Sequence, residues 1–165
     1  MKTFYLPYLF FALSALLFSC NNSGDEIKQQ ESNGEIAFDS LLAQKYGADT
    51  YGMKSYVMAF LKRGPNRSTD SIEVAQLQKA HLENIMKLAN EGKLIIAGPF
   101  LDNGDIRGIY IFDVKTIEEA QKLTETDPAI QNGSLIMELH PWYGSAALMA
   151  IPEIHKQIEK VSVAQ

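Results

Sequence analysis

Apolar residues recur every three to four positions between residues 70 and 92, and this spacing predicts an amphipathic helix. Six apolar residues fall on one stripe of the helix: Val74, Leu77, Leu82, Ile85, Leu88 and Ala89. Polar and charged side chains, Asn84 among them, fall outside it. Asp70 is a suitable N-cap, Glu73 follows it at the spacing of a capping box, and Gly92 provides a stop. We therefore expect one face of this helix to pack against the core.

His81 lies inside that apolar stripe, between Leu77 and Ile85. Histidine is a common general acid or base, and the ring nitrogens of a histidine directed towards the core need hydrogen-bond partners. The simpler interpretation is a core histidine bonded to a backbone carbonyl. Only the segments that follow the helix favour a catalytic role over that interpretation.

Four strands and a second helix are predicted around this helix. The first strand, residues 54–61, is apolar at both alternating sets of positions, as in a strand buried on both faces. Residues 93–100 and 106–114 form two further strands joined by a hairpin-like turn. Thr116 and Glu119 form a second capping box, which starts a helix reaching residue 126. The last strand ends at Trp142.

The order strand, helix, strand, strand, helix, strand is that of an α+β, ferredoxin-like βαββαβ fold. Two helices cover only one face of a four-stranded sheet, yet the first strand is apolar on both sides. Packing of two such sheets face to face supplies the missing cover, so we expect a homodimer.

The helix break at Asp127 is the second site of interest. Pro128 disfavours the helical conformation at Asp127, so its carboxylate stands between two elements. The plainer interpretation is that Asp127 caps the turn from Pro128 to Gly133.

The first twenty residues have the layout of an export signal. Met1 and Lys2 precede an uncharged run from residue 4 to 18, which is short for a membrane span, and Ser19-Cys20 follows. Residues 17–20 resemble a bacterial lipobox, so we expect lipidation of Cys20 and a lipid-anchored protein of the cell envelope, in the periplasm or at the outer membrane. Alternatives are a plainly secreted protein and an uncleaved anchor.

The chain therefore divides into four predicted parts. Residues 1–19 are a signal peptide, and residues 20–52 are a solvated tether followed by a short amphipathic helix that we expect to pack on the domain. Residues 53–145 are the folded domain. Residues 146–165 are a C-terminal extension with a weak helical pattern.

The composition of the chain bears on which kinds of partner it can bind. Twenty acidic against fifteen basic residues give a net charge of −5, so no basic footprint indicates nucleic acid. One cysteine excludes an internal disulfide bond. Three bases lie together in residues 62–67, and we interpret them as a solvated loop rather than as a guide for an anionic substrate.

The chain resembles the YCII-related (YciI-like) family over residues 54–143. The resemblance is carried by His81-Leu82, Glu91-Gly92-Lys93-Leu94, Gly98-Pro99-Phe100, Gly108, Glu118-Glu119-Ala120, Asp127-Pro128, Gly133 and Trp142. It implies a dimeric α/β barrel in which a helix histidine lies beside the aspartate of the Asp-Pro motif. By position, that pair is His81 and Asp127. We expect the substrate to contact the following residues: Gly98, Pro99, Phe100, His140 and Trp142.

A histidine–carboxylate pair suits general acid/base chemistry. The carboxylate fixes one imidazole tautomer and raises its basicity, which leaves the other nitrogen free for proton transfer. We expect proton abstraction, isomerisation or elimination on a small organic molecule, with no cofactor. No nucleophile motif occurs, and the spacing of His81, Asp127 and His140 matches no zinc pattern. The alternative is a non-catalytic binding or structural lipoprotein; a pocket open beside His81 favours catalysis, and a buried, dry pair favours the alternative.

Overall fold

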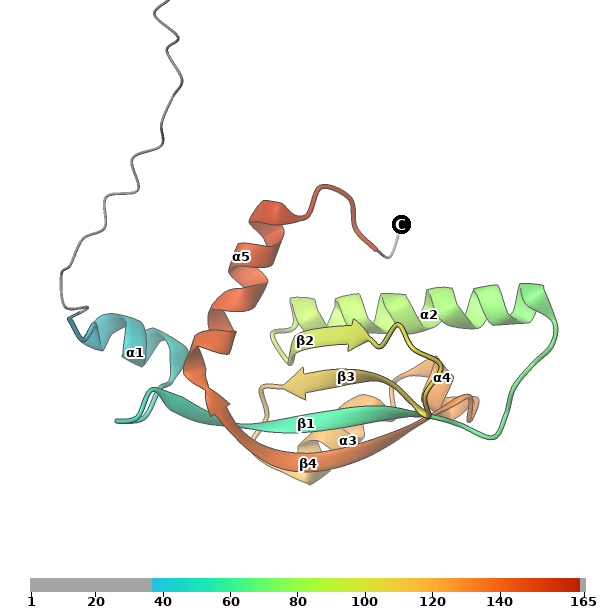
Figure 1. The fold of residues 1–165 in the computed structure, drawn as a ribbon, viewed down its shortest axis with the longest axis horizontal. Helices are drawn as coiled ribbons and strands as arrows, with labels where there is room; N and C mark the ends of the chain where they lie inside the picture. Colours follow the sequence, from blue (N-terminus) through green and yellow to red (C-terminus); the bar gives the residue numbers. More distant parts are fainter. Residues whose placement is uncertain (1–36, 164–165) are drawn as a thin grey trace, which may run out of the picture. The chain divides into compact units, whose positions relative to one another are not determined.

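The computed structural model describes residues 37–163. The predicted signal peptide, Cys20 and the tether lie outside the described residues. The chain divides into two compact units, Met1–Ala37 and Phe38–Gln165. The second unit contains the following elements (Figure 1): α1 Ser40–Tyr46, β1 Met53–Arg63, α2 Ser71–Asn90, β2 Leu94–Pro99, β3 Ile106–Phe112, α3 Ile117–Thr124, α4 Pro128–Gln131, β4 Leu135–Ser145, the 3₁₀ helix η1 Ala146–Ala150 and α5 Ile151–Ile158.

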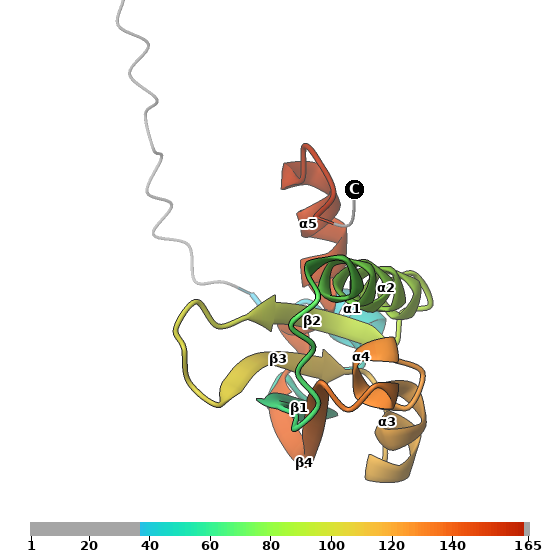
Figure 2. The ribbon, with the colours of Figure 1, turned by 90° about the vertical axis from the view of Figure 1, so that its right-hand side faces the viewer.

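The four strands form one antiparallel sheet in the order β2-β3-β1-β4. The strand β3 thus lies between β1 and β2, which α2 connects, as a split βαβ unit requires. Figure 2 shows α2, α3 and α4 together on one side of the sheet. The predicted α+β, ferredoxin-like fold is confirmed.

The core lies between the sheet and these helices. Val57, Ala59 and Leu61 of β1 face it at alternate positions, as the period of two of a strand requires. They pack with buried residues of the other elements: Leu88, Leu94, Tyr110, Phe112, Val114 and Ala120. Since each of these side chains is almost fully removed from water, this layer supplies the main hydrophobic stabilisation of the domain.

The opposite face of the sheet is only partly covered. Tyr56 is buried there, its ring centroid 5.8 Å from that of Trp142 and its hydroxyl donating to the Ser145 carbonyl at 3.1 Å. Further along β1, Met58 and Phe60 are only half-buried. The predicted burial of β1 on both faces is therefore correct at Tyr56. It is wrong at Met58 and Phe60 within this chain.

The α2 helix begins and ends as the sequence predicts, but its buried face is rotated. Asp70 caps the helix by accepting from the Ile72 amide at 2.8 Å, and Gly92 adopts φ 68° after its end. The buried residues are His81, Asn84 and Leu88, and Ala89 is exposed. The assignment of Asn84 to the solvated side was wrong. Its amide oxygen accepts from the Thr126 hydroxyl at 3.0 Å, which offsets part of the cost of burying it.

The predicted capping boxes are incomplete. The Glu73 carboxylate accepts from the Ser68 hydroxyl at 2.6 Å and not from the Asp70 amide, which donates instead to the Ser68 hydroxyl oxygen at 3.1 Å. The Glu119 carboxylate accepts from the Lys115 amide, one residue before the Thr116 cap. In both cases the acid satisfies the segment before the cap rather than the cap itself.

The helices α1 and α5 flank the domain without burying a residue of their own. Phe38 beside α1 is 81% exposed, so the expected packing of this amphipathic helix on the domain was wrong for its apolar face. Lys45 of α1 forms an ion pair with Glu153 of α5 at 2.9 Å. The C-terminal helix forms where the sequence predicts, and Ile158 on it is 75% exposed. Within residues 37–163, no helix is long and apolar enough to span a membrane.

Gly64 brings the loop after β1 against the segment before β4. Its amide donates to the Ser134 carbonyl at 2.9 Å, and the Asn66 amide donates to the Gly133 carbonyl at 3.1 Å. A Cβ at Gly64 would lie 2.2 Å from the Gly133 carbonyl oxygen, a backbone atom that has no room to move aside. This contact fixes the start of the loop that leads to α2.

We expect Gly64→Ala to lower the free energy of unfolding by about 1–3 kcal/mol, because the methyl group forces two backbone segments apart. Gly98→Ala is the matched control, since a Cβ at Gly98 meets nothing within 4 Å and the change should stay below about 1 kcal/mol. Urea denaturation measures both. Equal midpoints for the two variants would contradict the close approach at Gly64.

Candidate functional site

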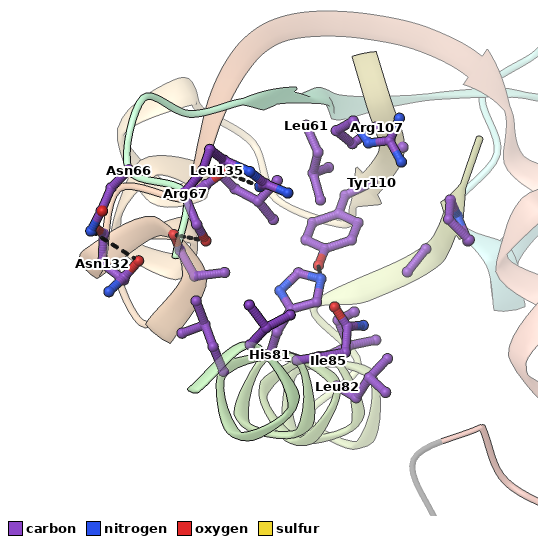
Figure 3. A pocket seen from close by; sticks show the side chains of 18 of the residues that line it. Leu61, Asn66, Arg67, His81, Leu82, Ile85, Arg107, Tyr110, Asn132 and Leu135 are labelled. Atoms are coloured by element: carbon purple, nitrogen blue, oxygen red, sulfur yellow. Dashed lines mark hydrogen bonds between the residues drawn. The ribbon is translucent and has the colours of Figure 1, made fainter. Parts of the chain in front are cut away.

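A cavity of about 350 Å³ lies between α2 and the sheet. Figure 3 shows His81 entering it from α2, with Tyr110 from β3 on the other side of the imidazole ring. Its apolar wall includes the following residues: Leu61, Leu77, Leu82, Ile85 and Leu135. Its polar side chains include the following: Asn66, Arg67, Ser68, Glu73, Gln78, Arg107, Asn132 and Ser134. A concave, mostly apolar site with a few polar groups is typical of small-molecule binding.

His81 is hydrogen-bonded to Asp127. The Nδ1 atom lies 2.7 Å from Oδ2, and His81 is 8% exposed. The contact between these two side chains, which lie 46 positions apart, is confirmed. Asp127 itself is fully buried behind the histidine.

Asp127 has two roles, one for each oxygen. Oδ1 accepts from the Ala129 amide at 2.9 Å and caps α4, in which Pro128 occupies the first turn. Oδ2 accepts from His81. The two interpretations of Asp127 drawn from the sequence, a cap and a partner for histidine, are therefore both correct structurally. Because the cap fixes the carboxylate, it also fixes the side of the imidazole ring that faces it.

This arrangement selects the tautomer of His81. An ionised carboxylate only accepts hydrogen bonds, so Nδ1 carries the proton and Nε2 keeps its lone pair in the neutral ring. The nearest side-chain partner of Nε2 is the Tyr110 hydroxyl at 3.4 Å, a long and weak contact. The basic nitrogen therefore remains available on the ring edge away from Asp127.

Tyr110 is a hydrogen-bond donor towards that nitrogen. Burial raises the pKa of its phenol well above the ordinary value, and the nearby Asp127 charge raises the pKa further. The hydroxyl thus stays protonated at neutral pH. Its ring lies nearly parallel to the imidazole, with centroids 6.4 Å apart and planes 19° apart. Tyr110 was not singled out from the sequence, where it is one of several apolar positions in a predicted strand.

The residues predicted to contact substrate divide between the two faces of the sheet. Gly98 and Pro99 line the cavity with His81. His140 and Trp142 lie on the opposite face: they pair with Met58 and Tyr56, out of phase with the core-facing positions of β1. Phe100, just after β2, is 44% exposed and does not line the cavity. The structure therefore does not bring Phe100, His140 or Trp142 together with His81.

The three bases of residues 62–67 lie in different surroundings: Lys62 and Arg63 end β1, and Arg67 lies in the loop that follows. Lys62 pairs with Glu138 at 2.8 Å on the face opposite the cavity, and Arg63 is exposed outside the cavity lining. Arg67 lines the cavity and donates to the Ser134 carbonyl at 3.2 Å. Arg67 is exposed, as the interpretation of a solvated loop predicts, and it also lies at the cavity. The cluster of bases in residues 62–67 was the sequence signal for a cationic side chain at the cavity.

Arg107 lines the cavity because of a β-bulge. Leu61 of β1 pairs with Gly108 of β3, and the next residue, Lys62, pairs with Ile106. Arg107 is the extra residue, and a bulge re-aims the side chain that it carries. The sequence contains no signal for it, since a bulge shows only in the register of two strands.

No cluster of three or more histidine, cysteine, aspartate or glutamate side chains suited to a metal ion occurs among residues 37–163. His81 and Asp127 touch each other, but His140 is on the other face of the sheet. The set of three residues weighed from the sequence as metal ligands is therefore not assembled.

The YCII-related domain model matches residues 56–143, just over half of the chain and the segment that holds His81, Asp127 and the cavity-lining strands. The chain belongs to the YCII-related domain family. No curated protein matches the chain. Among solved structures, the YCII-related chain is similar to 5-chloro-2-hydroxyhydroquinone dehydrochlorinase from Burkholderia phenoliruptrix AC1100 in complex with 2,5-dihydroxybenzoquinone. The identity is 21% and the TM-score 0.39, over 52% of this chain and 92% of that chain.

Proposed function

We propose that the cavity is an active site in which His81 exchanges protons with a small organic molecule. One observation carries the proposal: His81 is oriented by a fully buried carboxylate on one nitrogen and lines the cavity of about 350 Å³. A histidine that only stabilised the fold would have no need of an adjoining cavity. The cavity therefore supports catalysis over the non-catalytic alternative.

The proposed chemistry uses one nitrogen. Nε2 takes a proton from an acidic C–H or O–H group of the ligand, and the imidazolium that forms is stabilised by the Asp127 carboxylate. The protonated Nε2 then returns the proton to another atom of the ligand in an isomerisation, or to a leaving group in an elimination. The Tyr110 hydroxyl, held protonated by its surroundings, is placed to donate to an oxygen of the ligand once one occupies the site.

Asp127→Asn is a sharp test of this mechanism. The amide oxygen can still cap α4, but its NH₂ group then faces Nδ1 and forces the proton onto Nε2. The base is thereby blocked while the ring stays in place. Asp127→Ala is less informative, because it leaves buried donors of Ala129 and His81 without a partner.

We expect wild-type protein to accelerate deuterium incorporation into at least one carbon acid from a panel of 2-oxo acids and 1,3-diketones in D₂O, followed by proton NMR. His81→Ala and Asp127→Asn should each slow that exchange by about 100-fold or more. The controls are His140→Ala and His155→Ala, two exposed histidines outside the cavity, which should keep the wild-type rate. Exchange that survives in His81→Ala defeats the proposal, as does the absence of exchange across the whole panel.

We further propose that the protein is a homodimer that pairs through the half-covered face of the sheet. Support comes from the half-buried apolar residues on that face, Met58 and Phe60, and from Figure 2, in which α2, α3 and α4 all lie on the other side of the sheet. Such a face is removed from water when a second copy covers it.

Sedimentation of the domain at micromolar concentration should give a dimer, and Phe60→Lys should shift it to monomer by placing a charge in the interface. Ile72→Lys is the control, since Ile72 is 68% exposed on α2, away from that face, and this variant should remain dimeric. A wild-type monomer would contradict the proposed dimer.

We also propose that the chain is an exported lipoprotein of the bacterial cell envelope, anchored through Cys20. Support comes from the uncharged run before Ser19-Cys20 and from the polar stretch after it. Labelled fatty acid should enter the wild-type protein and not Cys20→Ser. A labelled Cys20→Ser protein or an unlabelled wild type would contradict anchoring, and the unlabelled wild type would favour simple secretion.

A further inference from the structure

We infer that Arg67 and Arg107 bind the carboxylate of the ligand, so that the site takes small organic acids with an apolar body. The inference rests on the proposed function in that it uses the same cavity. It goes beyond it by naming the chemical class of the ligand and the residues that select it.

Two arginines from different elements line one cavity. Arg67 comes from the loop between β1 and α2, and Arg107 from the bulge in β3. Figure 3 shows both on the side of the cavity opposite α2. Two backbone features hold them there: the close approach at Gly64 fixes the loop, and the bulge places Arg107.

Each guanidinium is anchored at one nitrogen and retains donors. One terminal nitrogen of Arg67 donates to the Ser134 carbonyl, and one of Arg107 donates to the Asp102 and Gly104 carbonyls at 3.0 and 3.3 Å. A guanidinium has five N–H donors in a planar fork, so the remaining donors of both side chains are available to a ligand. Anchoring also lowers the entropy lost when the ligand binds.

No carboxylate of the described chain neutralises these charges. Neither Arg67 nor Arg107 belongs to an ion pair among residues 37–163. Glu73 is the single acid that the described residues contribute to the lining of the cavity, and its carboxylate accepts from the Ser68 hydroxyl. Asp127 is buried behind His81 and engaged on both oxygens. The cavity therefore presents two positive charges and one negative charge to a ligand.

The rest of the wall defines the remainder of the ligand. Leucine and isoleucine side chains of α2, together with Leu61 and Leu135, make most of the surface apolar. An apolar body with one planar two-oxygen anion fits this combination, because the fork of arginine matches a carboxylate in a bidentate manner. With the acid held opposite α2, the body of the ligand extends towards His81 Nε2.

The test compares phenylacetate with phenylacetamide, which has nearly the same shape without the charge. Isothermal titration calorimetry should show that wild-type protein binds the acid about 10-fold more tightly than the amide or better, as hydrogen bonds to charged groups predict. Arg67→Gln and Arg107→Gln should each remove most of this preference while leaving the weak binding of the amide unchanged. Arg63→Gln is the matched control, because Arg63, the last residue of β1, is an exposed base just before the loop and lies outside the cavity lining; the preference of this variant should equal that of wild type.

Equal affinity of wild-type protein for acid and amide, or no binding of either, overturns the inference without reference to any variant. Inorganic phosphate that displaces phenylacetate at equal concentration also overturns it, since the site then selects oxyanions rather than organic acids. The outcomes for wild-type protein separate this inference from the proposed function. A wild type that binds the acid preferentially but exchanges no proton contradicts only the proposed chemistry, and a wild type that exchanges protons but binds acid and amide equally overturns only this inference.

Discussion

The buried carboxylate of Asp127 is the constraint on which the site depends. An ionised group out of contact with water is costly unless every oxygen finds a donor. Here Oδ1 takes the Ala129 amide and Oδ2 takes the His81 ring, so the start of α4 and the middle of α2 are tied to one side chain. Removing either donor would leave a buried acceptor unsatisfied, at a cost of about 1–3 kcal/mol. The same bonds that stabilise the fold thus fix the direction of the imidazole.

Because one carboxylate both stabilises the fold and orients the imidazole, a structural role and a catalytic role of His81 are compatible. The interaction at Nδ1 is structural, and it would be present in a protein without activity. What it leaves free is Nε2, whose one side-chain contact in the described part of the chain is the Tyr110 hydroxyl at 3.4 Å. The cavity beside the ring, rather than the strength of the His81–Asp127 bond, is what argues for chemistry.

The sequence predicts the fold well because hydrophobic period and turn residues agree with each other. Asp70 and Gly92 bound α2 as expected, and the alternation in β1 identifies Val57, Ala59 and Leu61 as neighbours on one face. The apolar stripe singled out His81 and the proline break singled out Asp127, but only the resemblance to the YCII-related family paired the two residues. The burial of Asn84 was predicted wrongly because it depends on a hydrogen bond between distant parts of the chain. The Thr126 hydroxyl donates to the Asn84 amide oxygen, and the helical period of the sequence carries no information on that bond.

The cavity itself was not predictable, because it depends on the register of strands and on close approaches of the backbone. A chain whose β1 and β3 paired without a bulge would direct Arg107 away from Tyr110, since successive residues of a strand face opposite sides. The bulge therefore places a cation on the face that also carries the histidine, while Lys62, one residue after Leu61, pairs with Glu138 on the other face. Lys62 and Arg107 thus lie on different faces of the sheet for a purely geometric reason. On one face of the sheet the charge of Lys62 is paired with Glu138, and on the other face the charge of Arg107 is available to a ligand.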